Sequence, residues 1–299
     1  MSSALWDSIQ NEMRQAFALR KGLISKIGEL FEDRYLISFY TSFKGGSSID
    51  ESDFEMLRTI LLDSKKLKKR KIIFIINSPG GNPLAAEKII KLLSEYSDND
   101  YWALIPGTAK SAATLICFGA SKIILSPISE LGPIDLQIYP ENDHALVPTH
   151  SIINAYDKLM EMGINLEDGK NIAPILQQLQ NFNPTEVETF RRVNELASDI
   201  AAKVLKKGMM KSVAKKEIKK VINIFLDPET SKTHGRPIFE SDISEVDKKK
   251  YFNIDCINTT EKKWQTINEY HLRMVWHMRV TGMGKIIESE ENSLEAKRQ

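Results

Sequence analysis

The feature that most constrains the fold is the stretch 71–138, in which two short glycine-containing turns each join an apolar strand-like run to an apolar helix-like run. The first apolar run, 72–76, is continuous and rich in β-branched residues, which is typical of a buried strand in a parallel sheet. It ends at Ser-Pro-Gly-Gly, residues 78–81, and apolar side chains at helical spacing follow over 85–93. Proline fixes φ, and glycines adopt conformations that other residues resist and let a ligand approach the backbone.

The second turn repeats this arrangement. A short strand predicted at 102–106 leads into a Gly-Thr turn, and Ser111 opens an apolar helical run over 112–118. A third strand is predicted at 122–125. This alternation of strand, turn and helix predicts an α/β fold built on a parallel sheet, with both turns facing the same place.

A serine at such a turn can be a nucleophile. The first N–H groups of a helix are unpaired and carry the positive end of its dipole, so they can stabilise negative charge beside Ser111. A glycine N–H from the first turn would be a second donor, and two backbone donors directed at one point form an oxyanion hole. The alternative is that Ser111 only caps its helix, because serine is a common N-cap, and that Gly80 and Gly81 only form a tight turn.

The segments NSPGG and GTAKSAATLICFGASKIILSPISELGPID resemble the Clp/crotonase superfamily of serine peptidases, and more narrowly the serine dehydrogenase proteinase family, soluble relatives of signal peptide peptidase A. The resemblance implies a Clp/crotonase-like fold of repeated ββα units with Ser111 as nucleophile. It implies oxyanion donors at the N–H groups of Gly81 and Ala112, with Gly80 in the same turn. It also implies a protein or peptide substrate, a homo-oligomer and no cofactor or metal, and it leaves open an unknown activator.

Ser111 also needs a partner residue, because a serine hydroxyl needs a base to take its proton. In this superfamily, Clp-type peptidases use a histidine with an aspartate, whereas signal peptide peptidase A and its relatives use a lysine alone. The place of the Clp-type histidine falls at Leu136, so the simple Clp-type triad is absent.

We therefore predict Lys158 as the general base. It lies on a helix predicted at 149–163, in a place comparable to that of the base in lysine-dyad members of the superfamily, and apolar neighbours could lower its pKa. His144 and His150 are alternatives, because either could fold back toward the serine. Asp135 is kept as an auxiliary carboxylate or a structural cap.

Composition limits the classes of function. The chain has 299 residues, with 41 Lys and Arg against 40 Asp and Glu, and this balance indicates neither a nucleic acid nor an acidic membrane surface as partner. Cys117 and Cys256 form neither a disulfide framework nor a metal-ligand spacing, which fits a reducing compartment. The polar start of the sequence does not resemble a signal peptide, and no apolar run is long enough to span a membrane. We expect a soluble, cytoplasmic protein.

The predicted organisation has four parts: an amphipathic N-terminal helix over 1–33, a peptidase core over 34–182, a C-terminal helical part over 183–284 and a tail over 285–299. The tail is charged and has no apolar face, so we predict that it is disordered. The leading functional hypothesis is a serine endopeptidase. The alternatives are a latent or inactive scaffold or regulated effector subunit, and an acyl-CoA enzyme of the crotonase type.

Overall fold

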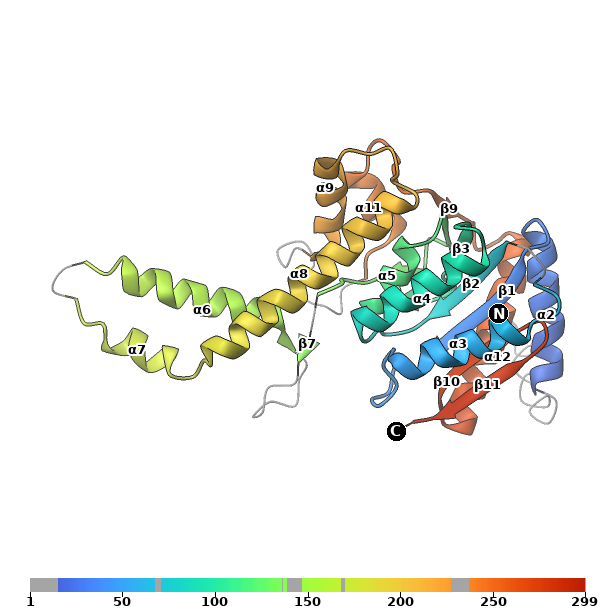
Figure 1. The fold of residues 1–299 in the computed structure, drawn as a ribbon, viewed down its shortest axis with the longest axis horizontal. Helices are drawn as coiled ribbons and strands as arrows, with labels where there is room; N and C mark the ends of the chain where they lie inside the picture. Colours follow the sequence, from blue (N-terminus) through green and yellow to red (C-terminus); the bar gives the residue numbers. More distant parts are fainter. Residues whose placement is uncertain are drawn as a thin grey trace.

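A seven-stranded sheet in the order β11-β10-β1-β2-β3-β5-β9 is the centre of the fold (Figure 1). The computed structural model describes residues 16–67, 71–135, 137–138, 147–167, 170–226 and 237–298. The parallel strands are β1 (Tyr35–Thr41), β2 (Ile72–Asn77), β3 (Tyr101–Leu104), β5 (Lys122–Leu125) and β9 (Ile254–Cys256). β10 (Met283–Ser289) pairs antiparallel with β1, and β11 (Ser293–Lys297) pairs antiparallel with β10. The predicted parallel sheet is confirmed.

Helices cover both faces of this sheet, as the continuous apolar sequence of β2 predicts. Side chains alternate between the two faces: Ile72, Phe74 and Ile76 belong to one buried core, and Ile73 and Ile75 to the other. The first core lies under α3 (Glu51–Asp63), α4 (Pro83–Tyr96), α5 (Ala112–Phe118), α8 (Pro184–Lys207), α9 (Lys215–Leu226) and α11 (Glu240–Val246). The second lies under α2 (Ala16–Leu30) and α12 (Lys262–Thr281).

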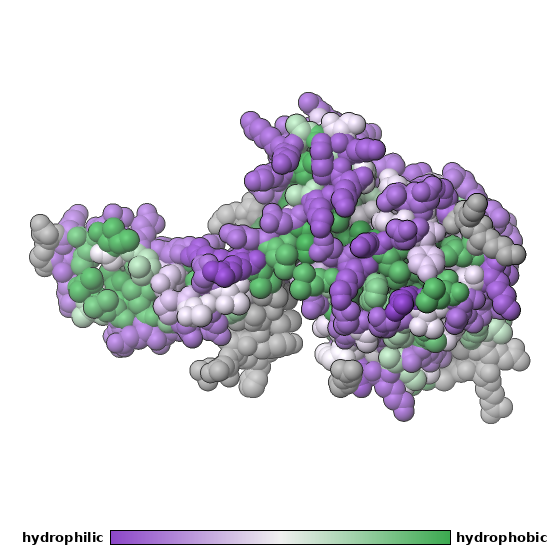
Figure 2. All heavy atoms as spheres, in the orientation of Figure 1, coloured by the Kyte–Doolittle hydropathy of each residue, from purple (hydrophilic) through white to green (hydrophobic). Residues whose placement is uncertain are grey.

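An arm projects from the sheet and consists of α6 (Thr149–Ile164), α7 (Ala173–Leu179) and the first half of α8 (Figure 1). α6 confirms the helix predicted from the sequence and runs outward from the core. A small core of Ile153, Val187 and Phe190 holds α6 against α8. Apolar side chains gather at the outer end of the arm (Figure 2), where Ile164 is 77% exposed.

Three short pairings lie near the carboxyl ends of the parallel strands. β4 (Thr108–Ala109) pairs in parallel with β6 (Glu130–Leu131), and β7 (Gln137–Ile138) pairs antiparallel with β8 (Val147–Pro148). An isolated bridge joins Ser78 to Ala109. The β4–β6 pairing and the Ser78–Ala109 bridge extend the ends of β2 and β3 and give the two predicted turns a backbone framework.

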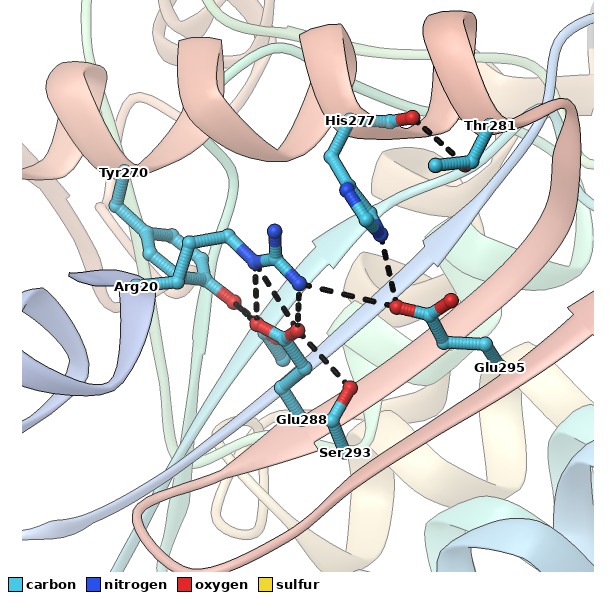
Figure 3. Close-up of polar contacts among 8 residues, drawn as sticks. Arg20, Tyr270, His277, Thr281, Glu288, Ser293 and Glu295 are labelled. Carbon is cyan, nitrogen blue, oxygen red and sulfur yellow. Dashed lines mark hydrogen bonds and ion pairs between the residues drawn. The ribbon is translucent and has the colours of Figure 1, made fainter. Parts of the chain in front are cut away.

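The prediction of a disordered C-terminal tail is wrong over the described residues, because 283–289 and 293–297 form β10 and β11. β10 is buried, and its charges are paired on both faces of the sheet. On the α2 and α12 face, both carboxylate oxygens of Glu288 lie 3.0 Å from Nε of Arg20, and Tyr270 donates to Oε2 at 3.2 Å (Figure 3). On the α3 face, Lys285 contacts two aspartates. A charged segment is expected to stay solvated only when its charges have no partners of opposite sign in the fold. Here the fold supplies such partners, so the segment is ordered.

The other parts of the predicted organisation stay predictions. α2 lies within the predicted N-terminal helix, but the first fifteen residues of that segment lie outside the described residues. α9 and α11 pack on the same core as α4 and α5, so the segment over 183–284 shares its core with the rest of the chain. Among the described helices, none combines the length and the apolar character needed to cross a membrane. Cys117 and Cys256 are both free.

Candidate active site

The two glycine turns meet at the carboxyl ends of β2 and β3, as the sequence predicts. Ser78 donates its N–H to the carbonyl oxygen of Thr108 at 2.9 Å, and Lys110 donates to the carbonyl oxygen of Ser78 at 3.1 Å. The side-chain oxygen of Asn77, at the end of β2, accepts the N–H of Thr108 at 3.0 Å. These bonds hold the end of one turn against the other.

Ser111 has a strained backbone at the start of α5. Its φ is 52° and its ψ is −122°, a conformation that costs a residue with a side chain about 1–3 kcal/mol and is kept where the surroundings enforce it. Its N–H donates to the carbonyl oxygen of Pro133 at 2.9 Å. The Ser111 side chain makes no capping hydrogen bond, so the alternative that this serine caps its helix is wrong. Among the described residues, the hydroxyl of Ser111 has no hydrogen-bond partner that would occupy it.

The Ser-Pro-Gly-Gly turn lies directly on Ser111 and requires glycine there. Gly80 has a φ of 104°, and a Cβ added to it would lie 2.5 Å from Cβ of Ser111 and 3.1 Å from the nitrogen of Ala112. Gly81 has a φ of 154°, and an added Cβ would lie 2.3 Å from the nitrogen of Ile49. Real Cβ atoms do not approach other atoms this closely, so only glycine lets the turn reach the start of α5.

The turn and the helix start each contribute a backbone donor. In the described part of the chain, neither the N–H of Gly81 nor that of Ala112 donates a hydrogen bond to another protein atom. Ala112 is the first residue of α5, where helix geometry provides no acceptor for the N–H. Backbone donors without a protein acceptor are the groups that an oxyanion hole uses.

A histidine–aspartate pair lies close in sequence to Pro133, whose carbonyl oxygen accepts the N–H of Ser111. Asp135 follows Pro133 by two residues, and its carboxylate oxygen Oδ2 lies 3.2 Å from Nδ1 of His150, at the start of α6. The atoms are within ion-pair distance, although they lack the alignment of a hydrogen bond. The side chain of Asp135 is 4% exposed and that of His150 is 14% exposed. A carboxylate near an imidazole can orient the ring for proton transfer.

Lys158 lies elsewhere. It is two turns beyond His150 on α6, about 12 Å further along the helix axis, and its side chain is exposed on the arm. No hydrogen bond or ion pair joins it to the described residues around Ser111. Of the two predicted histidines, His150 is close to Asp135, and His144 lies outside the described residues.

Sequence reasoning missed three groups that support the two turns. Glu130 lies 3.1 Å from Nζ of Lys110 and accepts from the Thr108 hydroxyl at 3.2 Å. The backbone of Ile49 packs on Gly81. His271 of α12 lies under the second turn, because a Cβ on Gly107 would lie 3.1 Å from its Cε1 and Nε2. Ile49 and His271 come from segments far from the turns in sequence, where no local pattern indicates them.

His271 should make the stability of the fold depend on pH. Burial lowers its pKa from 6.5 to about 4, so between these values the unfolded chain binds a proton that the folded chain does not. The free energy of unfolding therefore falls as the pH falls through this range, by about 2–3 kcal/mol between pH 7.5 and 4.5. His271→Gln should lose correspondingly less stability over the same range. Urea unfolding of both proteins at the two pH values measures the difference, and parallel pH dependence would contradict it.

A family model described as ClpP-like SDH-type serine proteinase matches residues 43–222. Two uncharacterized proteins of Methanocaldococcus jannaschii are 31% identical over 161 residues, covering 52% of this chain and 50% of the relative, and 34% identical over 140 residues, covering 45% and 44%. The chain thus spans about half the length of these relatives.

Among solved structures, two variants of the 1510-N membrane-bound stomatin-specific protease are similar, the second in complex with a substrate peptide. They are 17% and 14% identical, with a TM-score of 0.30 for each. The matches cover 48% of this chain and 72% of the first structure, and 76% and 94% for the second.

Proposed function

Because the chain belongs to the ClpP-like SDH-type serine proteinase family, we propose that it is a serine endopeptidase with Ser111 as nucleophile. The observation that carries the proposal is the backbone of Ser111, which is held at a φ of 52° with its hydroxyl unused by the helix it begins. Strain of this kind persists at functional sites, where it presents a side chain to a ligand. The finer description as a Clp/crotonase-like fold of repeated ββα units stays a prediction.

The N–H groups of Gly81 and Ala112 would form the oxyanion hole. When Ser111 attacks a peptide carbonyl, negative charge develops on the carbonyl oxygen, and two unpaired backbone donors stabilise it more than they stabilise the substrate. Removing one such donor typically costs about 10²- to 10³-fold in rate. The absence of a side chain at Gly80 supports this role, because it lets the turn approach Ala112.

For the base we favour His150, with Asp135 as its partner, over Lys158. A lysine acts as a base at neutral pH only when burial or nearby positive charge lowers its pKa. The exposed side chain of Lys158 has no such burial. His150 is half-buried beside the carboxylate of Asp135, which lies two residues from Pro133, whose carbonyl accepts the Ser111 N–H.

The proposed reaction has two stages. His150 takes the hydroxyl proton as Oγ of Ser111 bonds to the carbonyl carbon, and it then gives that proton to the amine nitrogen as the C–N bond breaks. Water attacks the resulting ester, His150 takes its proton, and the acid product leaves as Ser111 regains a proton. The substrate would be a protein or peptide; the homo-oligomer, the activator and the cytoplasmic location stay predictions.

Labelling with a fluorophosphonate probe tests the proposal, because the probe forms a stable adduct only with an activated serine. We expect one adduct on the wild-type protein by intact mass, located at Ser111 by peptide mapping. The Ser94→Ala variant, altered on α4, should label like the wild type. A folded wild-type protein that takes up no probe would favour the alternative hypothesis, in which the chain is a latent peptidase or a scaffold.

A further inference from the structure

The C-terminal strand β10 contacts the loop that supports the Ser-Pro-Gly-Gly turn. Ser42 donates its N–H to the carbonyl oxygen of Gly284 at 2.7 Å, and a Cβ on Gly284 would lie 2.8 Å from Oγ of Ser47. The next residue, Lys285, is 6% exposed and points to the α3 face of the sheet. β10 therefore brings a buried ammonium group to the segment that precedes α3.

Lys285 is held by two carboxylates at the start of α3. Its Nζ lies 2.7 Å from Oδ2 of Asp50 and 2.9 Å from Oδ2 of Asp53. Asp50 is the N-cap of α3, and its own N–H donates to Oδ2 of Asp53 at 2.8 Å. Burial alone would raise the pKa of Asp50, but bonds from Lys285 and Ser52 outweigh burial and hold that pKa below its ordinary value. The contact with Lys285 thus fixes a charged cap.

Ile49 connects this cap to the glycine turn. It immediately precedes Asp50, and its N–H donates to the carbonyl oxygen of Gly80 at 2.8 Å. Its carbonyl oxygen accepts the N–H of Asn82 at 2.8 Å. These two bonds hold the residues on either side of Gly81 and leave the N–H of Gly81 without a protein acceptor among the described residues. The backbone of Ile49 therefore sets the direction of that N–H.

We propose that Lys285 is a positioning residue, which holds Asp50 and Ile49 so that the Gly81 N–H keeps its direction. The inference rests on the proposed peptidase function, in which that N–H stabilises the oxyanion. Lys285 itself touches no substrate. Without its ammonium, Asp50 and Asp53 would be like charges sharing one site, and their repulsion would displace the cap and with it Ile49.

The catalytic test is Lys285→Met, which keeps an unbranched side chain and removes the charge. We expect kcat for peptide hydrolysis to fall about 10- to 100-fold with KM within about threefold, because a misdirected donor weakens transition-state binding and not substrate binding. Lys285→Arg, which restores a cation, should recover part of the loss. Lys297→Met, on the exposed side of the same hairpin, is the matched control and should behave as wild type.

Amide hydrogen exchange tests the same link without activity. The N–H groups of Ile49 and Asn82 should exchange about tenfold faster in Lys285→Met than in Lys297→Met, while amides of α5 stay protected. Should Lys285→Met not fold, Asp50→Asn keeps an N-cap side chain and should speed exchange at the same two amides. Unchanged exchange there would overturn the proposal.

The two proposals fail in different ways. An inactive, unlabelled wild-type protein would refute the peptidase function, and exchange at Ile49 and Asn82 would still decide whether Lys285 holds the turn. An active enzyme whose Lys285→Met variant keeps its kcat would refute the positioning role while leaving the peptidase function intact. A uniform rise in exchange across the whole chain would mean that Lys285 acts only on global stability.

Discussion

Replacing Ser111 with alanine is expected to lower kcat/KM for peptide hydrolysis by about 10⁴- to 10⁶-fold, the loss typical of removing a serine nucleophile. The substitution removes only the hydroxyl group. This group makes no capping bond in α5, so its loss leaves no backbone N–H of the helix unpaired. Alanine also meets the same backbone strain as serine at a φ of 52°. The free energy of unfolding should therefore change by less than about 1 kcal/mol.

The experiment pairs an activity assay with thermal unfolding of the same samples. Retained melting temperature with lost hydrolysis and lost probe labelling is the expected pattern. Ser94→Ala on α4 should keep the wild-type melting temperature, hydrolysis and probe labelling. Full hydrolysis by Ser111→Ala in a preparation free of other peptidases would refute the proposed nucleophile.

The second large effect concerns the base, where the sequence and the geometry of the site favour different residues. We expect His150→Ala to lower kcat by about 10²- to 10⁴-fold, the usual contribution of a general base, and Lys158→Ala to change it by less than about threefold. The reason is that His150 is half-buried and lies 3.2 Å from the carboxylate of Asp135, whereas Lys158 is exposed. Asp135→Asn should fall between them, because it weakens the orientation of the imidazole without removing it.

Steady-state kinetics of the three variants on one peptide substrate measures this order. The rates of probe labelling should show the same order among the variants. The probe reports the activation of Ser111 alone, because its adduct forms without the later hydrolysis of an ester. The reverse order, with Lys158→Ala inactive and His150→Ala active, would establish the lysine dyad predicted from the sequence. If Lys158→Ala and His150→Ala each lower kcat only slightly, His144 becomes the candidate base.

Local sequence was enough to predict the strands around the site, both glycine turns and the position of Ser111. The reason is that these features depend on short-range rules. An apolar β-branched run such as 72–76 specifies a buried strand, and Gly80 and Gly81 adopt a backbone that other residues resist. The helix from Thr149 was likewise predicted from its spacing of apolar residues.

Only the tertiary structure brought Asp135 to His150 and placed Lys158 on an exposed arm. It also turned the charged segment after residue 282 into the buried strand β10 and the partly exposed strand β11. A charged side chain is stable inside a protein only with a partner, and the partners of Lys285 and Glu288 are more than 230 residues away, at Asp53 and Arg20. No local pattern carries that information. Sequence alone thus predicted where a candidate nucleophile lies, and long-range pairing of buried charges decided how β10 joins the sheet.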